Sequence, residues 1–184
     1  MRITGGEVKG RNLAALKGLD IRPSSDLVRE AIFNLIGQQV RGRVLDLFAG
    51  TGALGIEALS RGANEAVFVD LSDQALRLIK KNLKLCGYVE RGKVYKRDLS
   101  RGLPSRFPWV GKKFDLVFLD PPYGKGLIPP VLKGLVERSI LTSPAVLVAE
   151  SRKEEVLPLS CGDLEVVDIR TYGETKIQVY EYEV

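Results

Sequence analysis

The chain has 184 residues, a length that suits one α/β domain with a buried core and is short for two. It contains no histidine, which excludes mechanisms that need an imidazole base or a histidine-bound zinc, and its two cysteines, Cys86 and Cys161, form no CxxC pair. We therefore expect a reduced, cytoplasmic protein that binds no metal and, without an apolar stretch long enough to span a bilayer, no membrane.

The net charge of +5 is distributed unevenly along the sequence. Residues 1–43 carry a net +4 and residues 77–113 carry +10, whereas residues 44–76 carry −4 and residues 114–184 carry −5. Two basic blocks that flank an acidic one suggest a polyanionic partner that meets an acidic pocket. A solvated surface is the ordinary explanation for any single charged run.

The first part of the chain predicts a basic arm followed by one helix. Residues 1–22 contain short β-like segments interrupted by glycines, with basic side chains between them, which is typical of a hairpin or arm. After Pro23, Ser24 or Ser25 can cap a helix, and apolar residues recur at helical spacing as far as Gly37. We expect this helix within residues 23–42.

From residue 43 onward, apolar runs alternate with helical segments. The runs predict strands at residues 44–48, 66–70, 93–97, 114–119 and 145–149, and helices at residues 53–61, 73–86 and about 131–138. Two further strands, 164–171 and 175–182, must form an antiparallel hairpin. The fold class is therefore α/β: a single domain over residues 1–184 whose core, residues 43–184, is a doubly wound, mostly parallel, seven-stranded Rossmann-like sheet.

A glycine-rich loop follows the first strand of this core. The segment from Gly50 through Gly52 to Gly55 reads GxGxxG and opens a helix, at the position where the backbone must approach a ligand closely. Asp70 ends the next strand, twenty residues after Gly50, where a carboxylate can accept hydrogen bonds from both hydroxyls of a ribose. The spacing therefore predicts a cofactor that contains a nucleoside.

The acidic residues around this loop favour S-adenosylmethionine over a dinucleotide. A pyrophosphate prefers a helix N-terminus without carboxylates, yet Asp46 precedes the first glycine by four residues and Glu57 is expected in the first helical turn. A sulfonium and an ammonium are attracted by such anions. Asp98 ends the third strand and could accept from an adenine amino group. Alternatively, Asp46 is an ordinary strand-end polar group, Glu57 a helix-dipole partner and Asp98 a loop cap.

The strand at residues 114–119 delivers Asp120-Pro121-Pro122-Tyr123 to the carboxyl edge of the sheet, where ligands of open α/β sheets bind. The prolines remove two backbone donors, which leaves carbonyl oxygens and the Asp120 carboxylate as acceptors. An exocyclic amine held by two acceptors can direct its lone pair at an incoming methyl group. Tyr123 offers a surface on which a flipped base can stack. A rigid turn with a core tyrosine is the alternative.

These residues resemble a known family. Asp120-Pro121-Pro122-Tyr123 looks like the (N/D/S)PP(Y/F) motif of amino-group methyltransferases, and residues 46–57, DLFAGTGALGIE, look like their cofactor motif. More specifically, the whole chain resembles the bacterial 16S ribosomal RNA guanine-N2 methyltransferases of the RsmD family. The segments that carry this likeness are residues 9–13, 22–30, 33–34, 57–63 and 172–176.

The resemblance implies methylation of a guanine N2 amine in 16S ribosomal RNA, with S-adenosylmethionine as cofactor. It places the cofactor against Asp46, Phe48, Gly50, Gly52, Asp70, Leu71, Asp98 and Leu99, and the reaction at Asp120, Pro121 and Tyr123. The expected RNA contacts are Lys9, Arg11, Lys17, Arg22 and Arg29, while the basic run at residues 77–84 fits a solvated helix face better. The substrate would be free RNA or a partly assembled small ribosomal subunit, met by a monomer.

Three other functions remain open on the sequence alone. Adenine-N6 methylation of RNA or DNA uses the same motifs. A nicotinamide oxidoreductase would explain the glycine loop and Asp70, but not Asp46 or the DPPY segment. A non-catalytic RNA-binding module would explain the basic blocks, but it has no need for an acidic pocket.

Overall fold

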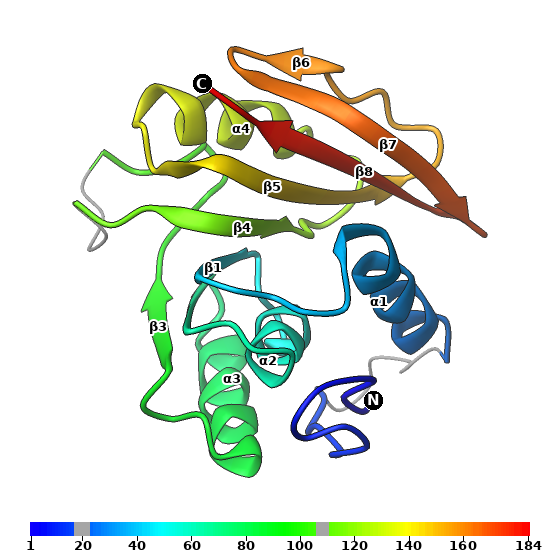
Figure 1. Cartoon of the computed structure of the whole chain (residues 1–184), viewed down its shortest axis with the longest axis vertical. Helices are drawn as coiled ribbons and strands as arrows, with labels where there is room; N and C mark the ends of the chain where they lie inside the picture. Colours follow the sequence, from blue (N-terminus) through cyan, green and yellow to red (C-terminus); the bar gives the residue numbers. More distant parts are fainter. Residues whose placement is uncertain (17–22, 106–110) are drawn as a thin grey trace.

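The computed structural model describes residues 1–16, 23–105 and 111–184, which form one eight-stranded sheet and four helices (Figure 1). The strand order is β3-β2-β1-β4-β5-β8-β7-β6. The strands are β1 (Arg43–Leu47), β2 (Glu65–Asp70), β3 (Gly92–Lys96), β4 (Phe114–Leu119), β5 (Leu141–Arg152), β6 (Ser160–Cys161), β7 (Leu164–Tyr172) and β8 (Thr175–Tyr182). The mostly parallel sheet with its C-terminal antiparallel hairpin is confirmed, and the short β6 is added to the seven expected strands.

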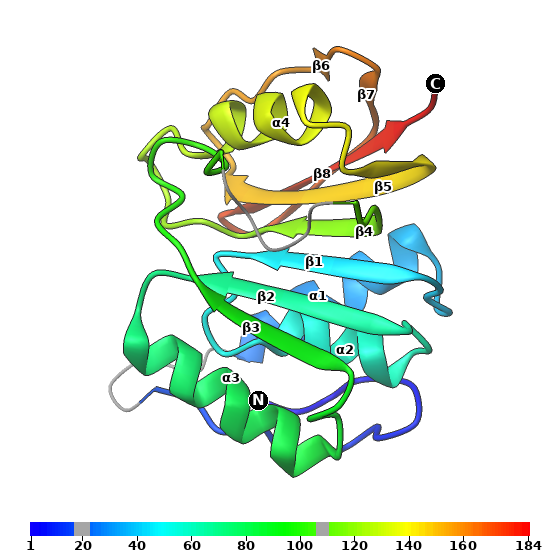
Figure 2. The ribbon, with the colours of Figure 1, turned by 90° about the vertical axis from the view of Figure 1, so that its left-hand side faces the viewer.

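The helices lie on both faces of the sheet. They are α1 (Pro23–Ile36), α2 (Ala53–Ser60), α3 (Asp73–Cys86) and α4 (Ile128–Glu137). Helices α1, α2 and α3 cover one face and α4 covers the other, so that two separate apolar clusters sandwich the sheet (Figure 2). Helix α1 begins at Pro23, one to two residues before the expected serine caps, because proline suits the first position of a helix.

Alternation along β1 decides which side chains enter each layer. Leu45 and Leu47 belong to the apolar cluster beneath α4, whereas Val44 belongs to the cluster beneath the other three helices. Since successive side chains of a strand point to opposite faces, Asp46 points to the same face as Val44. The sequence thereby places a carboxylate under α2, where it is 1% exposed.

The order of the strands creates a crevice between β1 and β4. The chain moves outward from β1 through β2 to β3, and then returns to place β4 on the other side of β1. At such a switch point the connections leave in opposite directions, and ligands of open α/β sheets bind outside the carboxyl ends of the two strands. The glycine loop follows β1 and the DPPY segment follows β4, so both motifs meet at this crevice.

The N-terminal arm packs against the layer of three helices. Arg2 and Asn12 form an antiparallel bridge, and Ile3 and Leu13 are buried in the helix-layer cluster, as a hairpin-like arm requires. The buried Asn82 of α3 donates to the carbonyls of Ala14 and Thr51 at 3.0 and 2.9 Å and accepts from the Ala14 N–H at 2.7 Å. One amide side chain therefore fastens the arm to the glycine loop.

Candidate active site

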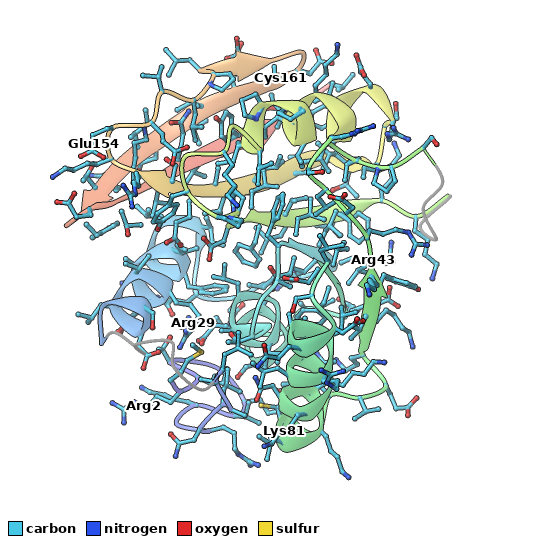
Figure 3. All side chains as sticks on the ribbon, turned by 180° about the vertical axis from the view of Figure 1, so that it is seen from behind. Arg2, Arg29, Arg43, Lys81, Glu154 and Cys161 are labelled. Atoms are coloured by element: carbon cyan, nitrogen blue, oxygen red, sulfur yellow. The ribbon has the colours of Figure 1, made fainter. Side chains whose placement is uncertain are left out.

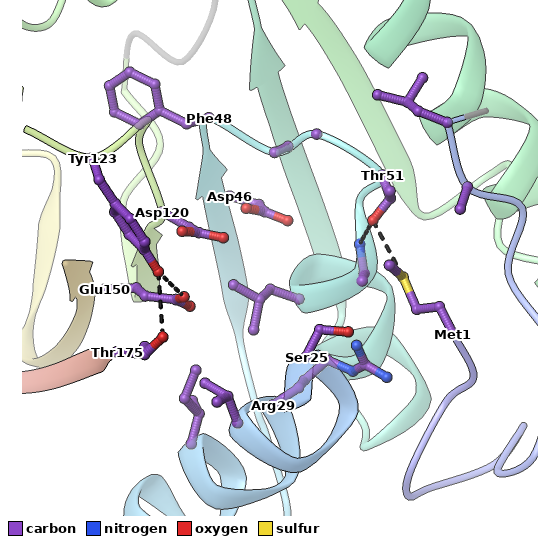
Figure 4. Close-up of a pocket in the computed structure, with 18 of the residues that line it drawn as sticks. Met1, Ser25, Arg29, Asp46, Phe48, Thr51, Asp120, Tyr123, Glu150 and Thr175 are labelled. Atoms are coloured by element: carbon purple, nitrogen blue, oxygen red, sulfur yellow. Dashed lines mark hydrogen bonds between the residues drawn. The ribbon is translucent and has the colours of Figure 1, made fainter. Parts of the chain in front are cut away.

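A cavity of about 480 Å³ opens at the crevice between β1 and β4. Its walls come from the arm, α1, the glycine loop, the DPPY segment, the end of β5 and the start of β8 (Figure 4). Five of the predicted cofactor and catalytic residues line it together: Asp46, Phe48, Gly50, Asp120 and Tyr123. The two motifs therefore face a single cavity, with the glycine loop on one side and the DPPY segment on the other.

Asp46 supplies a buried carboxylate to this cavity. Its Oδ2 accepts the Gly55 N–H at 2.9 Å, at the N-terminal end of α2. Burial raises the pKa of Asp46 to about 8, the Gly55 hydrogen bond opposes that rise and the nearby Asp70 charge adds to it. A group whose charge is this poorly compensated would be stabilised in its ionised form by a cationic ligand.

Gly50 and Gly55 of the loop are each glycine for a different structural reason. Gly50 has φ +57°, which disfavours other residues, and a Cβ added there would meet nothing within 4 Å. A Cβ at Gly55 would lie 2.4 Å from the Phe68 ring, so glycine lets α2 approach β2. The Gly50 N–H donates to Asp70 Oδ2 at 2.9 Å, which holds the loop against the end of β2.

Asp120 points into the cavity directly after β4. Within the described residues its carboxylate accepts no hydrogen bond, and the residue is partly exposed where it lines the cavity. Burial raises the pKa of Asp120 well above its usual value, and the charges of Glu150 and Asp46 raise it further. A bound donor that hydrogen-bonds to Asp120 would favour its ionised form, in which both carboxylate oxygens accept.

Tyr123 is oriented by two polar groups on the neighbouring strands. Its hydroxyl donates to Glu150 Oε1 at 2.7 Å and lies 3.4 Å from Thr175 Oγ1 (Figure 4). The Arg152 guanidinium lies 5.9 Å from the ring centroid. Burial and the Glu150 carboxylate raise the pKa of Tyr123, which therefore stays a neutral hydrogen-bond donor.

Glu150 is the residue that the sequence interpretation missed. It lies on β5, lines the cavity beside Asp120 and has a pKa raised chiefly by burial. The available signal was an acidic residue directly after the apolar run at residues 145–149, on the strand next to the DPPY segment. Asp46, Asp120 and Glu150 together make the cavity strongly acidic.

The other predicted cofactor and catalytic residues do not line this cavity. They are Gly52, Asp70, Leu71, Asp98, Leu99 and Pro121. Asp70 nevertheless contacts the loop through Gly50, while Asp98 Oδ1 accepts the Ser100 N–H at 2.9 Å, as in the loop-cap alternative. Leu99 is 3% exposed within the apolar cluster beneath α4, whereas Leu71 is exposed.

Two expectations about charge are wrong. Glu57 lies beyond the first turn of α2, fully buried, and its oxygens accept from the guanidinium groups of Arg29 and Arg61 at 3.0 and 2.9 Å, so its charge is compensated away from the cofactor loop. Arg29 is 3% exposed, because it pairs with Glu57 and Asp26 and donates to the Arg2 carbonyl. Arg29 does line the cavity (Figure 4), but these partners occupy its guanidinium, so it stabilises the protein interior and is not exposed to an RNA phosphate.

The remaining basic residues lie on the surface. Lys9 and Arg11 are exposed on the arm, and Arg11 also donates to the Leu85 carbonyl at 2.7 Å. Lys17 and Arg22 lie outside the described residues. The basic side chains of α3, including Lys81 (Figure 3), point to solvent on the outer face of that helix.

Residues 1–16, 23–105 and 111–184 contain no cluster of three potential metal ligands of the His, Cys, Asp or Glu type. Among the same residues, no helix combines the length and apolar character that crossing a membrane requires.

The chain is similar over its full length to known proteins. The family model described as Conserved hypothetical protein 95 matches residues 1–181. YlbH of Bacillus subtilis (strain 168), whose given name proposes an rRNA methyltransferase, is 40% identical over 98% of both chains. Ribosomal RNA small subunit methyltransferase D of Escherichia coli (strain K12) is 31% identical over 100% of this chain and 90% of its own. The solved structure of Escherichia coli yhhF, described as a proposed methyltransferase, has a TM-score of 0.81 at 30% identity and covers 100% of this chain and 98% of its own.

Proposed function

This chain belongs to the family described as Conserved hypothetical protein 95, the RsmD family of the sequence resemblance, and from that premise we propose that it is an rRNA methyltransferase. The proposed reaction is transfer of a methyl group from S-adenosylmethionine to the exocyclic N2 amine of a guanine in 16S ribosomal RNA. The observation that carries this proposal is the Asp120 carboxylate, which faces the same cavity as Asp46 and accepts no hydrogen bond from the described residues.

The donor and acceptor chemistry of the cavity fits S-adenosylmethionine. Asp46 keeps one carboxylate oxygen without a partner in the described part of the chain, which suits an ammonium group. Open space beside Gly50 leaves room for a ligand against the backbone. When bound, the cofactor would supply a methyl group on an already activated carbon, so that positioning contributes most of the acceleration.

The other residues would position the base. Asp120 and the Pro121 carbonyl would accept the two N–H bonds of the amine, and this would orient its lone pair toward the methyl group. Tyr123, whose hydroxyl is fixed by Glu150, would stack on the flipped base, an interaction worth about 1–3 kcal/mol. As the amine nitrogen takes the methyl group, the sulfur–methyl bond would break and its electron pair would stay on sulfur, which leaves S-adenosylhomocysteine. The amine would gain positive charge and release its proton to Asp120 or water. This sequence of events requires no imidazole.

We propose further that the chain works as one methyltransferase domain, as a monomer in the cytoplasm, on free RNA or on a partly assembled small subunit. Its exposed arm, with Lys9 and Arg11, would contact phosphates. Gly52, Asp70, Leu71, Asp98 and Leu99 stay predictions for the cofactor.

Nucleoside analysis of methylated RNA tests the reaction. Unmodified 16S ribosomal RNA and small subunits lacking the modification are incubated with the protein and S-adenosylmethionine that carries a labelled methyl group. N2-methylguanosine as the labelled nucleoside supports the proposal. N6-methyladenosine as the sole product would instead support the adenine alternative, and tight RNA binding without label transfer would support a binding module.

A further inference from the structure

The Glu150 carboxylate has one oxygen to which the proposed reaction assigns no hydrogen bond. Its Oε1 accepts from Tyr123, but no hydrogen bond within the described residues reaches its Oε2, and the side chain lines the cavity (Figure 4). Two neighbouring carboxylates, Asp120 and Glu150, therefore present three oxygens without partners toward the space next to Tyr123.

The sheet register fixes these two carboxylates side by side. Leu119 of β4 pairs with Ala149 of β5 in parallel register, and Asp120 and Glu150 are the next residues of the two chains. Neighbouring strands lie about 4.8 Å apart, and paired residues point to the same face. Asp120 and Glu150 can therefore serve adjacent donors of a single ligand.

Guanine has such a set of adjacent donors. Its N2 amine carries two N–H bonds, and the neighbouring N1 atom carries a third. Adenine has the opposite arrangement beside its amine, because its N1 carries a lone pair that a carboxylate repels. Enzymes that flip a base read it by hydrogen bonds to this Watson–Crick edge.

We propose that Glu150 selects guanine by accepting the N1–H of the flipped base with its free oxygen, while Asp120 holds the adjacent N2 amine. This inference rests on the proposed function and assigns the specificity of the same site. Tyr123 contributes by donating to Oε1, which leaves Oε2 to face the base. Glu150 thus contacts the substrate without taking part in the transfer itself.

The test compares guanosine with 2-aminopurine at the methylated position of a synthetic RNA. 2-Aminopurine keeps the N2 amine, but its N1 is an acceptor. Because a site built to accept a hydrogen bond rejects an analogue without that donor, the wild type should prefer guanosine by about 100-fold in kcat/KM. In Glu150→Gln the new amide can donate to N1, so the preference should fall below about tenfold. 2-Aminopurine also lacks the O6 atom of guanine. This loss lowers kcat/KM for the analogue in the wild type and in Glu150→Gln alike, so it cancels when their preferences are compared.

Two variants separate base contact from indirect effects. Glu154→Gln alters an exposed carboxylate near the same strand end and should keep the wild-type preference. Tyr123→Phe removes the hydroxyl that donates to Glu150 but keeps the stacking ring, and it should lower the preference less than Glu150→Gln does, because the carboxylate that accepts the N1–H remains. Equal loss of preference in Tyr123→Phe and Glu150→Gln would overturn the inference, since Glu150 would then act only through Tyr123.

The proposal can fail without the proposed function failing. Equal methylation of guanosine and 2-aminopurine by the wild type would overturn it even if Glu150→Gln did not fold, and so would an unchanged preference in a folded Glu150→Gln protein. Absence of guanosine methylation by the wild type would contradict the proposed function instead.

Discussion

The Nε atom of Arg29 donates to the Glu57 carboxylate at 3.0 Å, and the two side chains are 4% and 0% exposed. The same carboxylate accepts from Arg61 and from the backbone N–H groups of Thr4 and Gly5. One buried anion thereby joins the arm, α1 and α2. Since the arm and α1 form walls of the cavity, this network determines the shape of the proposed active site.

Glu57→Gln should destabilise the protein strongly. The substitution keeps the volume but leaves the buried Arg61 guanidinium without a counter-charge and Arg29 with only Asp26; breaking such a buried pair typically costs about 3–5 kcal/mol. Urea unfolding monitored by circular dichroism measures the change. Glu137→Gln is the matched control, because its Lys133 pair is exposed and should contribute less than about 1 kcal/mol. Equal effects of the two substitutions would contradict the structural role of Glu57.

Asp120→Asn should abolish most of the activity while cofactor binding persists. The amide keeps one acceptor oxygen but loses the charge that stabilises the developing positive amine, so we expect kcat to fall by about 100-fold or more. Calorimetry with S-adenosylhomocysteine should show a Kd within about threefold of the wild type. Unchanged kcat in the variant would remove Asp120 from the mechanism.

Cofactor binding should release a proton near neutral pH. Folding raises the pKa of Asp46 from 3.8 to about 8. Between these two pH values the folded, ligand-free protein holds a proton on Asp46, whereas the unfolded chain has lost it. This group's contribution to the stability of the ligand-free protein is therefore complete below pH 3.8 and is lost as pH rises toward 8. A cation beside Asp46 favours the ionised form and lowers its pKa.

Calorimetric titrations in buffers of different ionisation enthalpy count this proton. We expect release of about one proton at pH 7 and tighter binding as pH rises toward 8. In Asp46→Asn the affinity for the cofactor should no longer depend on pH in this range, and fewer protons should be released on binding. Equal proton counts for this variant and the wild type would show that Asp46 does not titrate with binding.

The arm should account for part of the salt dependence of RNA binding. Replacing both Lys9 and Arg11 with alanine removes two exposed charges, which should lower the slope of log affinity against log salt by about 1.5. Lys133→Ala is the control, because this exposed residue lies on α4, on the other side of the sheet. A slope equally reduced in the control would mean that the arm has no special role.

The sequence was most informative where a local pattern alone determines the structure. Helix α3 begins after Ser72 and ends before Gly87 as predicted, because a side-chain cap and a left-handed glycine define its ends. The meeting of Asp46 and Asp120 was also predictable, since both motifs follow strands at the carboxyl edge of a parallel sheet.

The sequence was least informative where distant contacts decide a residue's role. Arg29 looked like a surface cation, but its partners Glu57 and Arg2 come from other segments. Glu150 was missed because β5 continues to Arg152 through pairing with β8, although the apolar run ends at Ala149. Tertiary pairing thus extended a strand and turned an ordinary acidic residue into part of the cavity.

Mass-spectrometric mapping of 16S ribosomal RNA tests the central claim most directly. RNA is compared between source cells with the gene, cells without it, and deleted cells that express the wild type or Asp120→Asn. We predict that one N2-methylguanosine disappears on deletion, returns with the wild type and stays absent with Asp120→Asn. An unchanged set of N2-methylguanosines, or loss of N6-methyladenosine alone, would contradict the assignment.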